Sequence, residues 1–268
     1  MNAHEIDYQI FGEEMQFVEI ELDPFETVVA ESGSLMMKDS EIEMTTIFGD
    51  GSQRQADKGI WGKVLSAGKR LVTGESLFLT AFTHGGSGKR KVSFASPYPG
   101  RIIPLDLSAL EGKIVCQKDA FLCAAKGAEV GIEFSKKLGR GFFGGEGFIM
   151  QKIEGDGMAF LHAGGTVVER DLVIGEVLHV DTGCLVGFTR DVDYDIEMIK
   201  GVKNMIFGGE GIFYARLEGP GKVWIQSLPF SRLADRVLRS SKNYGRKSNT
   251  GEGSILGGLG DLLDGDGW

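Results

Sequence analysis

The chain has 268 residues, of which 42% are hydrophobic and 25% charged, a balance that supports a sizeable core and excludes a disordered protein. It contains 41 glycines but only six prolines and no Gly-X-Y period, which excludes collagen and favours an all-β fold with many tight turns. The net charge of −9 argues against nucleic acid as a partner, because a nucleic-acid binder must neutralise phosphates.

The N-terminus and the cysteines indicate a reducing compartment. The first residues lack the basic and apolar regions of a signal peptide, and no uncharged apolar run reaches the ~18 residues that would span a bilayer. Cys116, Cys123 and Cys184 each lie in or beside an apolar stretch, and they form no Cys-x-x-Cys pair. We therefore expect a cytoplasmic protein with free cysteines that behave as small apolar residues.

Residues 8–100 contain the first copy of a strand pattern. Two strands meet at Gly33 within residues 26–36, and a charged strand follows at 41–44. A Gly-Glu block at 74–78 leads into the next strand, and the glycine-rich segment 85–88 precedes another at 92–94. This segment is interpreted as a hairpin turn.

The same pattern returns twice at nearly constant spacing. Residues 144–149 recur at 208–213, an offset of 64, and residues 112–123 recur at 175–186, an offset of 63. The recurrence predicts one triplicated β domain over residues 1–229, with units of about 8–100, 101–165 and 166–229 that form a β-sandwich or barrel. Turns such as 155–157 are expected to close hairpins.

Apolar residues at helical spacing precede each Gly-Glu block. They occupy 60–72 in the first unit, 198–206 in the third and, less regularly, 138–143 in the second. We interpret them as short helices or loops that plug an open end of the β structure, and the alternative is a cofactor or lipid site.

The C-terminal part departs from the strand pattern. Residues 230–247 predict a basic amphipathic helix, in which Arg232 and Arg236 lie on or near the polar side and Phe230, Leu233 and Val237 on the apolar side. Residues 248–268 form a Gly-rich acidic tail. The helix is interpreted as a packed or subunit-contact helix, with a membrane surface as the weaker alternative.

The sequence nominates no catalytic, cofactor-binding or metal-binding set. Residues 139–144 spell Gly-x-Gly-x-x-Gly, but a strand is expected after them where a dinucleotide site needs a helix. Residues 85–90 resemble a phosphate loop, but Thr83 and Arg90 stand where glycine and Ser/Thr are required. The histidines are scattered, and His179 is interpreted as a core or edge residue.

Equivalent glutamates are the remaining site candidate. Glu75, Glu146 and Glu210 occupy the same place in the three copies, so around a pseudo-threefold axis their carboxylates could converge on a ligand or cation. A second set consists of Glu43, Glu133 and Glu197. The favoured interpretation is that each glutamate accepts hydrogen bonds from turn amides or pairs with a basic group in the neighbouring copy.

Four glycine-containing motifs carry a family resemblance. They are residues 31–37, 74–78, 143–147 and 207–211. With these motifs the chain resembles bacterial members of the altered-inheritance-of-mitochondria (mitochondrial biogenesis) family. The resemblance implies a fold similar to the tryptophan RNA-binding attenuator protein and assembly as a homo-oligomer. Mitochondrial relatives are tied to inner-membrane organisation, and the resemblance implies no catalytic residues.

These observations predict a non-enzymatic binding or scaffold protein that acts as a homo-oligomer and binds protein partners without a cofactor. One alternative is a small-ligand or metal-binding protein that uses the equivalent glutamates. The other is peripheral membrane association through the C-terminal helix.

Overall fold

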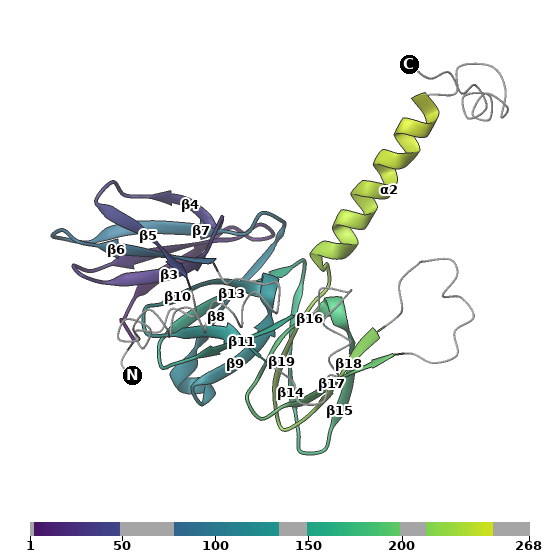
Figure 1. Cartoon of the computed structure of the whole chain (residues 1–268). Coiled ribbons are helices and arrows are strands. Elements are labelled where there is room, and N and C mark those ends of the chain that lie inside the picture. The colour runs from purple at the N-terminus through teal and green to yellow at the C-terminus, as the bar shows by residue number, and fades with distance from the viewer. Residues whose placement is uncertain (1–2, 49–77, 134–148, 199–212, 249–268) are drawn as a thin grey trace, which may run out of the picture. The chain divides into compact units, whose positions relative to one another are not determined.

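The computed structural model describes residues 3–48, 78–133, 149–198 and 213–248 (Figure 1). The chain divides into two compact units, Met1–Pro229 and Phe230–Trp268. The first unit is built from strands, which confirms the all-β class, and the second contains helix α2 (Phe230–Ser248). The predicted plugs at 60–72 and 138–143 lie outside the described residues, as does 198–206 beyond Met198, the last residue of a strand.

Strand β1 (Asp7–Phe11) precedes three strand groups of six strands each. Strand group 1 contains β2 (Phe17–Leu22), β3 (Thr27–Glu31), β4 (Leu35–Lys38), β5 (Ile42–Phe48), β6 (Phe78–His84) and β7 (Arg90–Ala95). Strand group 2 contains β8 (Gly100–Asp106), β9 (Lys113–Gln117), β10 (Phe121–Ala125), β11 (Glu129–Ile132), β12 (Met150–Glu154) and β13 (Met158–Gly164). Strand group 3 contains β14 (Val167–Leu172), β15 (Val177–Asp181), β16 (Leu185–Thr189), β17 (Asp193–Met198), β18 (Phe213–Glu218) and β19 (Gly221–Gln226).

The same antiparallel pairing scheme occurs in all three strand groups. The first and third strands of a group flank its sixth strand, and the second and fourth strands flank its fifth. The resulting sets are β2-β7-β4 with β3-β6-β5, β8-β13-β10 with β9-β12-β11, and β14-β19-β16 with β15-β18-β17. A β-bulge occurs at one position of the third strand in each group, with register shifts at Leu35/Met37, Phe121/Cys123 and Leu185/Gly187.

Two antiparallel junctions connect the strand groups edge to edge. Strand β3 of group 1 pairs with β10 of group 2, and β9 of group 2 pairs with β16 of group 3. The junctions produce two six-stranded sheets, β5-β6-β3-β10-β13-β8 and β11-β12-β9-β16-β19-β14. The remaining sheets have the orders β1-β2-β7-β4 and β15-β18-β17.

The core consists of three apolar clusters between the sheets. Because side chains alternate along a strand, β3 contributes Val28 and Ala30 to one cluster and Val29 to another. The first cluster also contains Ile20 of the β1-β2-β7-β4 sheet, whereas the second contains Trp224 of β19. The third cluster joins residues of β16 and β19 to residues of β18. Around the junctions both faces of the joined sheets are therefore buried, which accounts for the fully buried β10.

The predicted hairpins at the glycine-rich turns are wrong. The segment 85–89 leads from β6 to β7, and residues 155–157 lead from β12 to β13, but in each case the two strands belong to different sheets. Each of these strands is the centre of a three-stranded set, so both of its edges are already paired and the chain must cross to another sheet. The sheets of the described residues do not close into a barrel, so only the sandwich alternative fits.

Candidate functional site at the junctions between strand groups

The candidate glutamates give no ligand site within the described residues. Glu75, Glu146 and Glu210 lie outside that part of the chain. In the second set, Glu133 pairs with the Lys113 ammonium at 3.1 Å, but this lysine belongs to the same unit and not to the neighbouring copy that the favoured interpretation named. Across the described ranges, no three His, Cys, Asp or Glu side chains gather in a way that could hold a metal ion.

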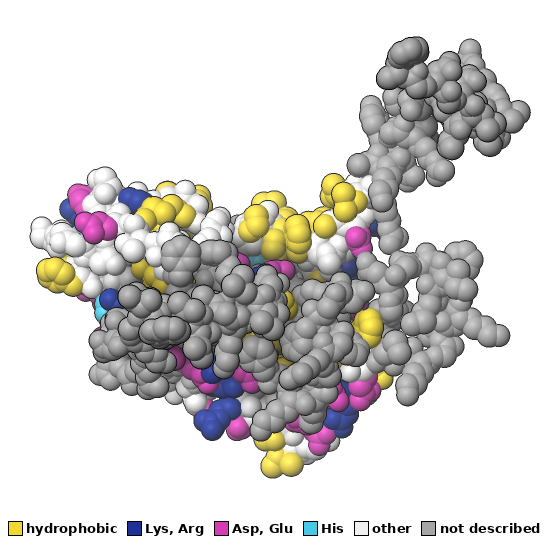
Figure 2. All heavy atoms as spheres, in the orientation of Figure 1, with side chains coloured by type: hydrophobic (Ala, Val, Ile, Leu, Met, Phe, Trp, Pro, Cys, Tyr) yellow, Lys and Arg dark blue, Asp and Glu magenta, His cyan; other side chains and the backbone are white. Residues whose placement is uncertain are grey.

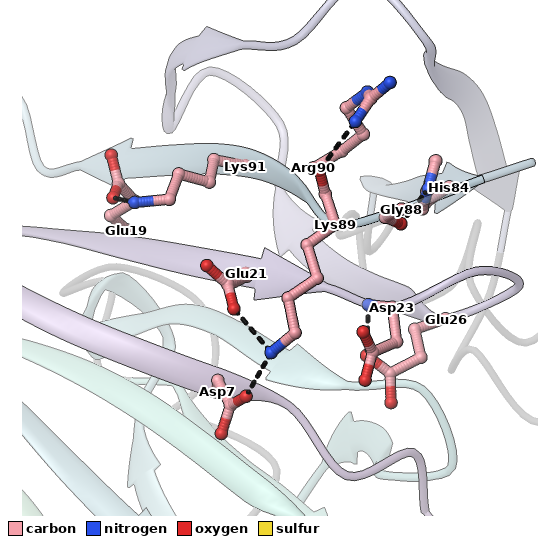
Figure 3. Close-up of polar contacts among 10 residues, drawn as sticks. All are labelled: Asp7, Glu19, Glu21, Asp23, Glu26, His84, Gly88, Lys89, Arg90 and Lys91. Carbon is pink, nitrogen blue, oxygen red and sulfur yellow. Dashed lines mark hydrogen bonds and ion pairs between the residues drawn. The ribbon is translucent and has the colours of Figure 1, made fainter. Parts of the chain in front are cut away.

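The segment that resembles a phosphate loop is organised by His84 instead. The buried ring accepts a hydrogen bond from the Gly86 amide at Nδ1 (3.3 Å), and its Nε2 therefore donates to the Gly88 carbonyl (2.9 Å; Figure 3). Lys89 contacts the carboxylates of Asp7 and Glu21 at 3.2 and 2.6 Å. The amide and the lysine that would contact a phosphate thus already interact with the protein itself.

Charged side chains on this sheet form cross-strand pairs typical of a solvated face. Lys91 of β7 contacts Glu19 of β2 at 2.6 Å (Figure 3). Acidic and basic side chains are interspersed on the face that Figure 2 shows. Because the ammonium groups are half exposed, solvent screens these pairs and they add little to stability.

Two amide side chains, of the buried Gln226 and the partly buried Gln117, stabilise the junction between strand groups 2 and 3. Gln226, the last residue of β19, accepts a hydrogen bond from the Gly164 amide (2.7 Å) and donates to the Gly183 carbonyl (2.8 Å). Gln117, the last residue of β9, donates to the Thr182 carbonyl at 2.5 Å. Both carbonyls belong to the 3-10 turn η5 (Thr182–Cys184) that leads into β16. The two glutamines therefore satisfy backbone groups where two strand groups meet.

The junction between strand groups 1 and 2 has ionisable side chains at the matching positions. Glu31 ends β3 as Gln117 ends β9. His162 of β13 matches Gln226 of β19, because each comes directly after the residue that pairs with the last residue before the bulge. At this junction, the 3-10 turn η3 (Lys118–Ala120) leads into β10, as η5 leads into β16 at the other junction. An uncharged amide network at one junction thus corresponds to an acid and a base at the other.

Burial strongly shifts the pKa values of the ionisable side chains at this junction. Desolvation, reinforced by the Asp119 carboxylate, raises the pKa of Glu31 to about 7. Desolvation lowers the pKa of His162 to about 4, so this ring is neutral at physiological pH. Burial, together with the charges of Asp119 and Glu31, raises the pKa of Tyr98 to about 12.

The geometry around His162 leaves little room for a ligand. The ring is 2% exposed and packs edge-on against Tyr98, with 4.6 Å between the ring centroids. A Cβ atom on Gly100 would lie 2.6 Å from the His162 Nε2 atom, so only glycine fits there. With a pKa of about 7, Glu31 can bind and release a proton near neutral pH.

Two strands correspond to those that pair at the internal junctions, but each has only one neighbouring strand within the described residues. β4 pairs only with β7, and β15 only with β18. Met36, Met37 and Val177 on these edges are 53%, 48% and 40% exposed. His179 on β15 is exposed too, so the edge interpretation of this residue is correct.

The fold and its junctions define an all-β protein whose strand groups are connected through the edges of their sheets. The chain belongs to the mitochondrial biogenesis AIM24 family, whose sequence model matches residues 8–228, and this confirms the resemblance. An uncharacterised protein of Streptococcus pyogenes serotype M6 is 30% identical over 230 residues, which cover 84% of this chain and 87% of the relative. The crystal structure of a Streptococcus pyogenes protein matches with a TM-score of 0.67 at 24% identity, covering 88% of this chain and 100% of that one.

Sequence reasoning missed the junction residues. Gln226 and His162 are separated by 64 residues, the spacing of the repeated motifs, but neither belongs to a glycine motif. Their shared position becomes visible only from the strand register. Among the described residues, no helix is long and apolar enough to cross a membrane.

Proposed function

We propose that this protein is a non-enzymatic scaffold that works as a homo-oligomer and presents its β surfaces to protein partners. The observation that carries the proposal is the edge-to-edge joining of three strand groups with one pairing scheme, which leaves β4 and β15, the counterparts of the joined strands, with one partner each in the described chain. Sheet edges with accessible backbone groups are sites at which another strand can add.

The interactions of the polar side chains support a structural role over a catalytic one. Gln226 and Gln117 each bind a backbone group of the neighbouring strand group, and His84 organises its own loop. Their hydrogen-bonding capacity serves the fold, as is common for buried polar groups.

Sedimentation velocity of the full chain from about 1 to about 100 µM tests this proposal, because the mass of an assembling protein depends on its concentration. We expect species heavier than the 29.0 kDa chain to increase with concentration. A 29.0 kDa monomer over the whole series would overturn the proposal.

The composition of α2 favours a second candidate function, peripheral association with an anionic membrane surface. Phe230, Val237 and Leu238 of this helix are 49%, 60% and 57% exposed, while Arg232 and Arg236 are exposed as well. A helix with exposed apolar and basic side chains can lie at a lipid interface. Flotation with anionic and neutral vesicles, using the full chain and a chain that ends at Pro229, tests this candidate. Equal flotation of the two chains would exclude the helix as the anchor.

A further inference from the structure

We propose that β4 of one copy of this chain pairs antiparallel with β15 of a second copy, so that copies associate head to tail. This inference rests on the proposed function, because it specifies the surface through which the scaffold assembles.

The internal junctions show which strands are complementary. Each joins the second strand of one strand group to the third strand of the next, as β3·β10 and β9·β16. In the described chain, the second strand of group 3, β15, and the third strand of group 1, β4, have no such partner. A junction between these two strands would continue the existing series from one copy into the next.

The internal junctions also predict the register of the new pair. Val29 faces Ala124 in the first junction, and Val115 faces Phe188 in the second. His179 is the third residue of β15, as Val29 and Val115 are in their strands. Lys38 occupies the same position after the bulge as Ala124 and Phe188. The expected register therefore places His179 opposite Lys38, Val180 opposite Met37 and Leu178 opposite Asp39.

The backbone of both edges is oriented for this pairing. The Gly219 amide donates to the Glu176 carbonyl at 3.0 Å, so residue 176 points toward β18 and, by strand alternation, His179 points away from it. The Asp39 amide donates to the Lys91 carbonyl at 2.9 Å, so Lys38 likewise points away from β7. His179 and Lys38 can therefore exchange two backbone hydrogen bonds, with Met37 and Val180 in the adjacent non-hydrogen-bonded pair.

Burial at the internal junctions also indicates that a strand of a second copy covers β4. Met36 and Met37 are 53% and 48% exposed, but their equivalents in β10, Leu122 and Cys123, are 2% and 0% exposed. The equivalent of Met36 in β16, Val186, is 0% exposed. At the internal junctions, side chains equivalent to the exposed methionines of β4 are thus buried where a second strand pairs. Because the two edges differ, the contact is heterologous, and it can extend through several copies or close a ring.

A proline substitution in the full chain tests the hydrogen bonds directly. His179→Pro removes the amide hydrogen that points outward, whereas His179→Ala removes the same imidazole and keeps the amide. Measured by sedimentation velocity, we expect His179→Pro to weaken assembly at least about tenfold and His179→Ala to change it by less than about threefold. Near-native circular dichroism and melting should accompany both, because this amide is not used in the β15-β18-β17 sheet. If His179→Pro does not fold, Lys38→Pro against Lys38→Ala makes the same comparison on the other edge.

Disulfide trapping tests the register and distinguishes a second copy from the same chain. Met37→Cys and Val180→Cys are introduced into separate chains that also carry Cys184→Ala. A non-hydrogen-bonded pair brings the two Cα atoms to about 4.5 Å, a distance that suits a disulfide. We expect a covalent dimer in the mixture and none from either chain alone. Shifting one cysteine by a residue, as Lys38→Cys, should abolish the dimer.

Each contrary outcome has a distinct meaning. A dimer from Met37→Cys alone would overturn the head-to-tail arrangement. An internal disulfide in a chain that carries both cysteines, with no dimer in the mixture, would show that β4 and β15 pair within one chain and would overturn the inference. If His179→Pro assembled as strongly as the wild type, the inference would be overturned, but the proposed function would still stand. A monomeric wild-type chain would overturn both the inference and the proposed function.

Discussion

The pair Glu31 and Gln117 shows how one side chain changes the chemistry of a junction. Both residues end the strand that joins its strand group to the next. The Gln117 amide donates to a turn carbonyl without any charge, whereas a carboxylate at this position is desolvated and faces the Asp119 charge. Glu31 therefore binds a proton in the folded protein at a pH where the unfolded chain has released it.

Replacing Glu31 with glutamine should stabilise the protein at alkaline pH. Because the folded-state pKa of about 7 lies above the ordinary value of 4.5, the folded state binds more protons between these limits, and stability falls as pH rises through this window. We expect Glu31→Gln to raise the unfolding free energy by roughly 1–2 kcal/mol at pH 8 and to change it little at pH 4.5. Urea unfolding at both pH values measures the effect, and the exposed Glu43→Gln serves as the control. An equal effect at both pH values would contradict the proton-linkage explanation.

Replacing His162 with glutamine, the residue at the matching position of β19, should remove a loss of stability in acid. The pKa of His162 is lowered from 6.5 to about 4, so the unfolded chain binds a proton that the folded chain excludes, and stability falls as pH drops from 6.5 toward 4. We expect the wild type to lose roughly 2 kcal/mol more than His162→Gln between pH 6.5 and 4.5. Unfolding curves at these pH values show the difference, and His179→Gln on the exposed edge provides the comparison. Parallel pH profiles for the wild type and His162→Gln would refute this assignment.

Some backbone geometry could not be predicted from residue type. Phe25 has a φ angle of 73°, in the left-handed region that favours glycine, and it is 75% exposed. It lies two residues before β3, and Gly175, with a φ of 78°, lies two residues before β15. Glycine at position 175 indicates this turn in the sequence, but the phenylalanine at the equivalent position 25 gives no such indication.

At the scale of the elements, the sequence predicted strand positions better than strand partners. The apolar stretch at 92–94 is indeed part of a strand, because alternation reflects burial of one or both faces. Pairing depends on which edges remain available once other strands have paired, and a short glycine turn carries no information about that. The junctions β3·β10 and β9·β16, which create the polar networks, were therefore outside the reach of sequence patterns.

The Gln226 network predicts a cost for losing one junction side chain. Gln226→Ala leaves the buried Gly164 amide and the partly buried Gly183 carbonyl without their side-chain partner. We expect a loss of about 3 kcal/mol of unfolding free energy, because unsatisfied buried groups retain their desolvation penalty. Ser227→Ala, which removes an exposed contact to the Thr166 amide, should cost less than about 1 kcal/mol. Urea unfolding of both variants tests the contrast, and similar losses would show that the Gln226 bonds do not stabilise the junction.

At the scale of the whole molecule, the described clusters place the stability of the first unit within its sheets. The three apolar clusters contain residues of β2 through β19, and none of the described residues of α2 belongs to them. The sheets should therefore fold without the helix.

A chain that ends at Pro229 tests this separation. Because the apolar clusters remain complete, we expect its melting temperature to lie within about 3 °C of the full chain, a shift below about 1 kcal/mol for a domain of this size. Differential scanning calorimetry at matched protein concentration measures the shift, and sedimentation velocity shows whether assembly persists. If the edges β4 and β15 mediate assembly, the truncated chain retains it, because both strands remain. A large drop in melting temperature would instead support the interpretation of the helix as one that packs on its own protein.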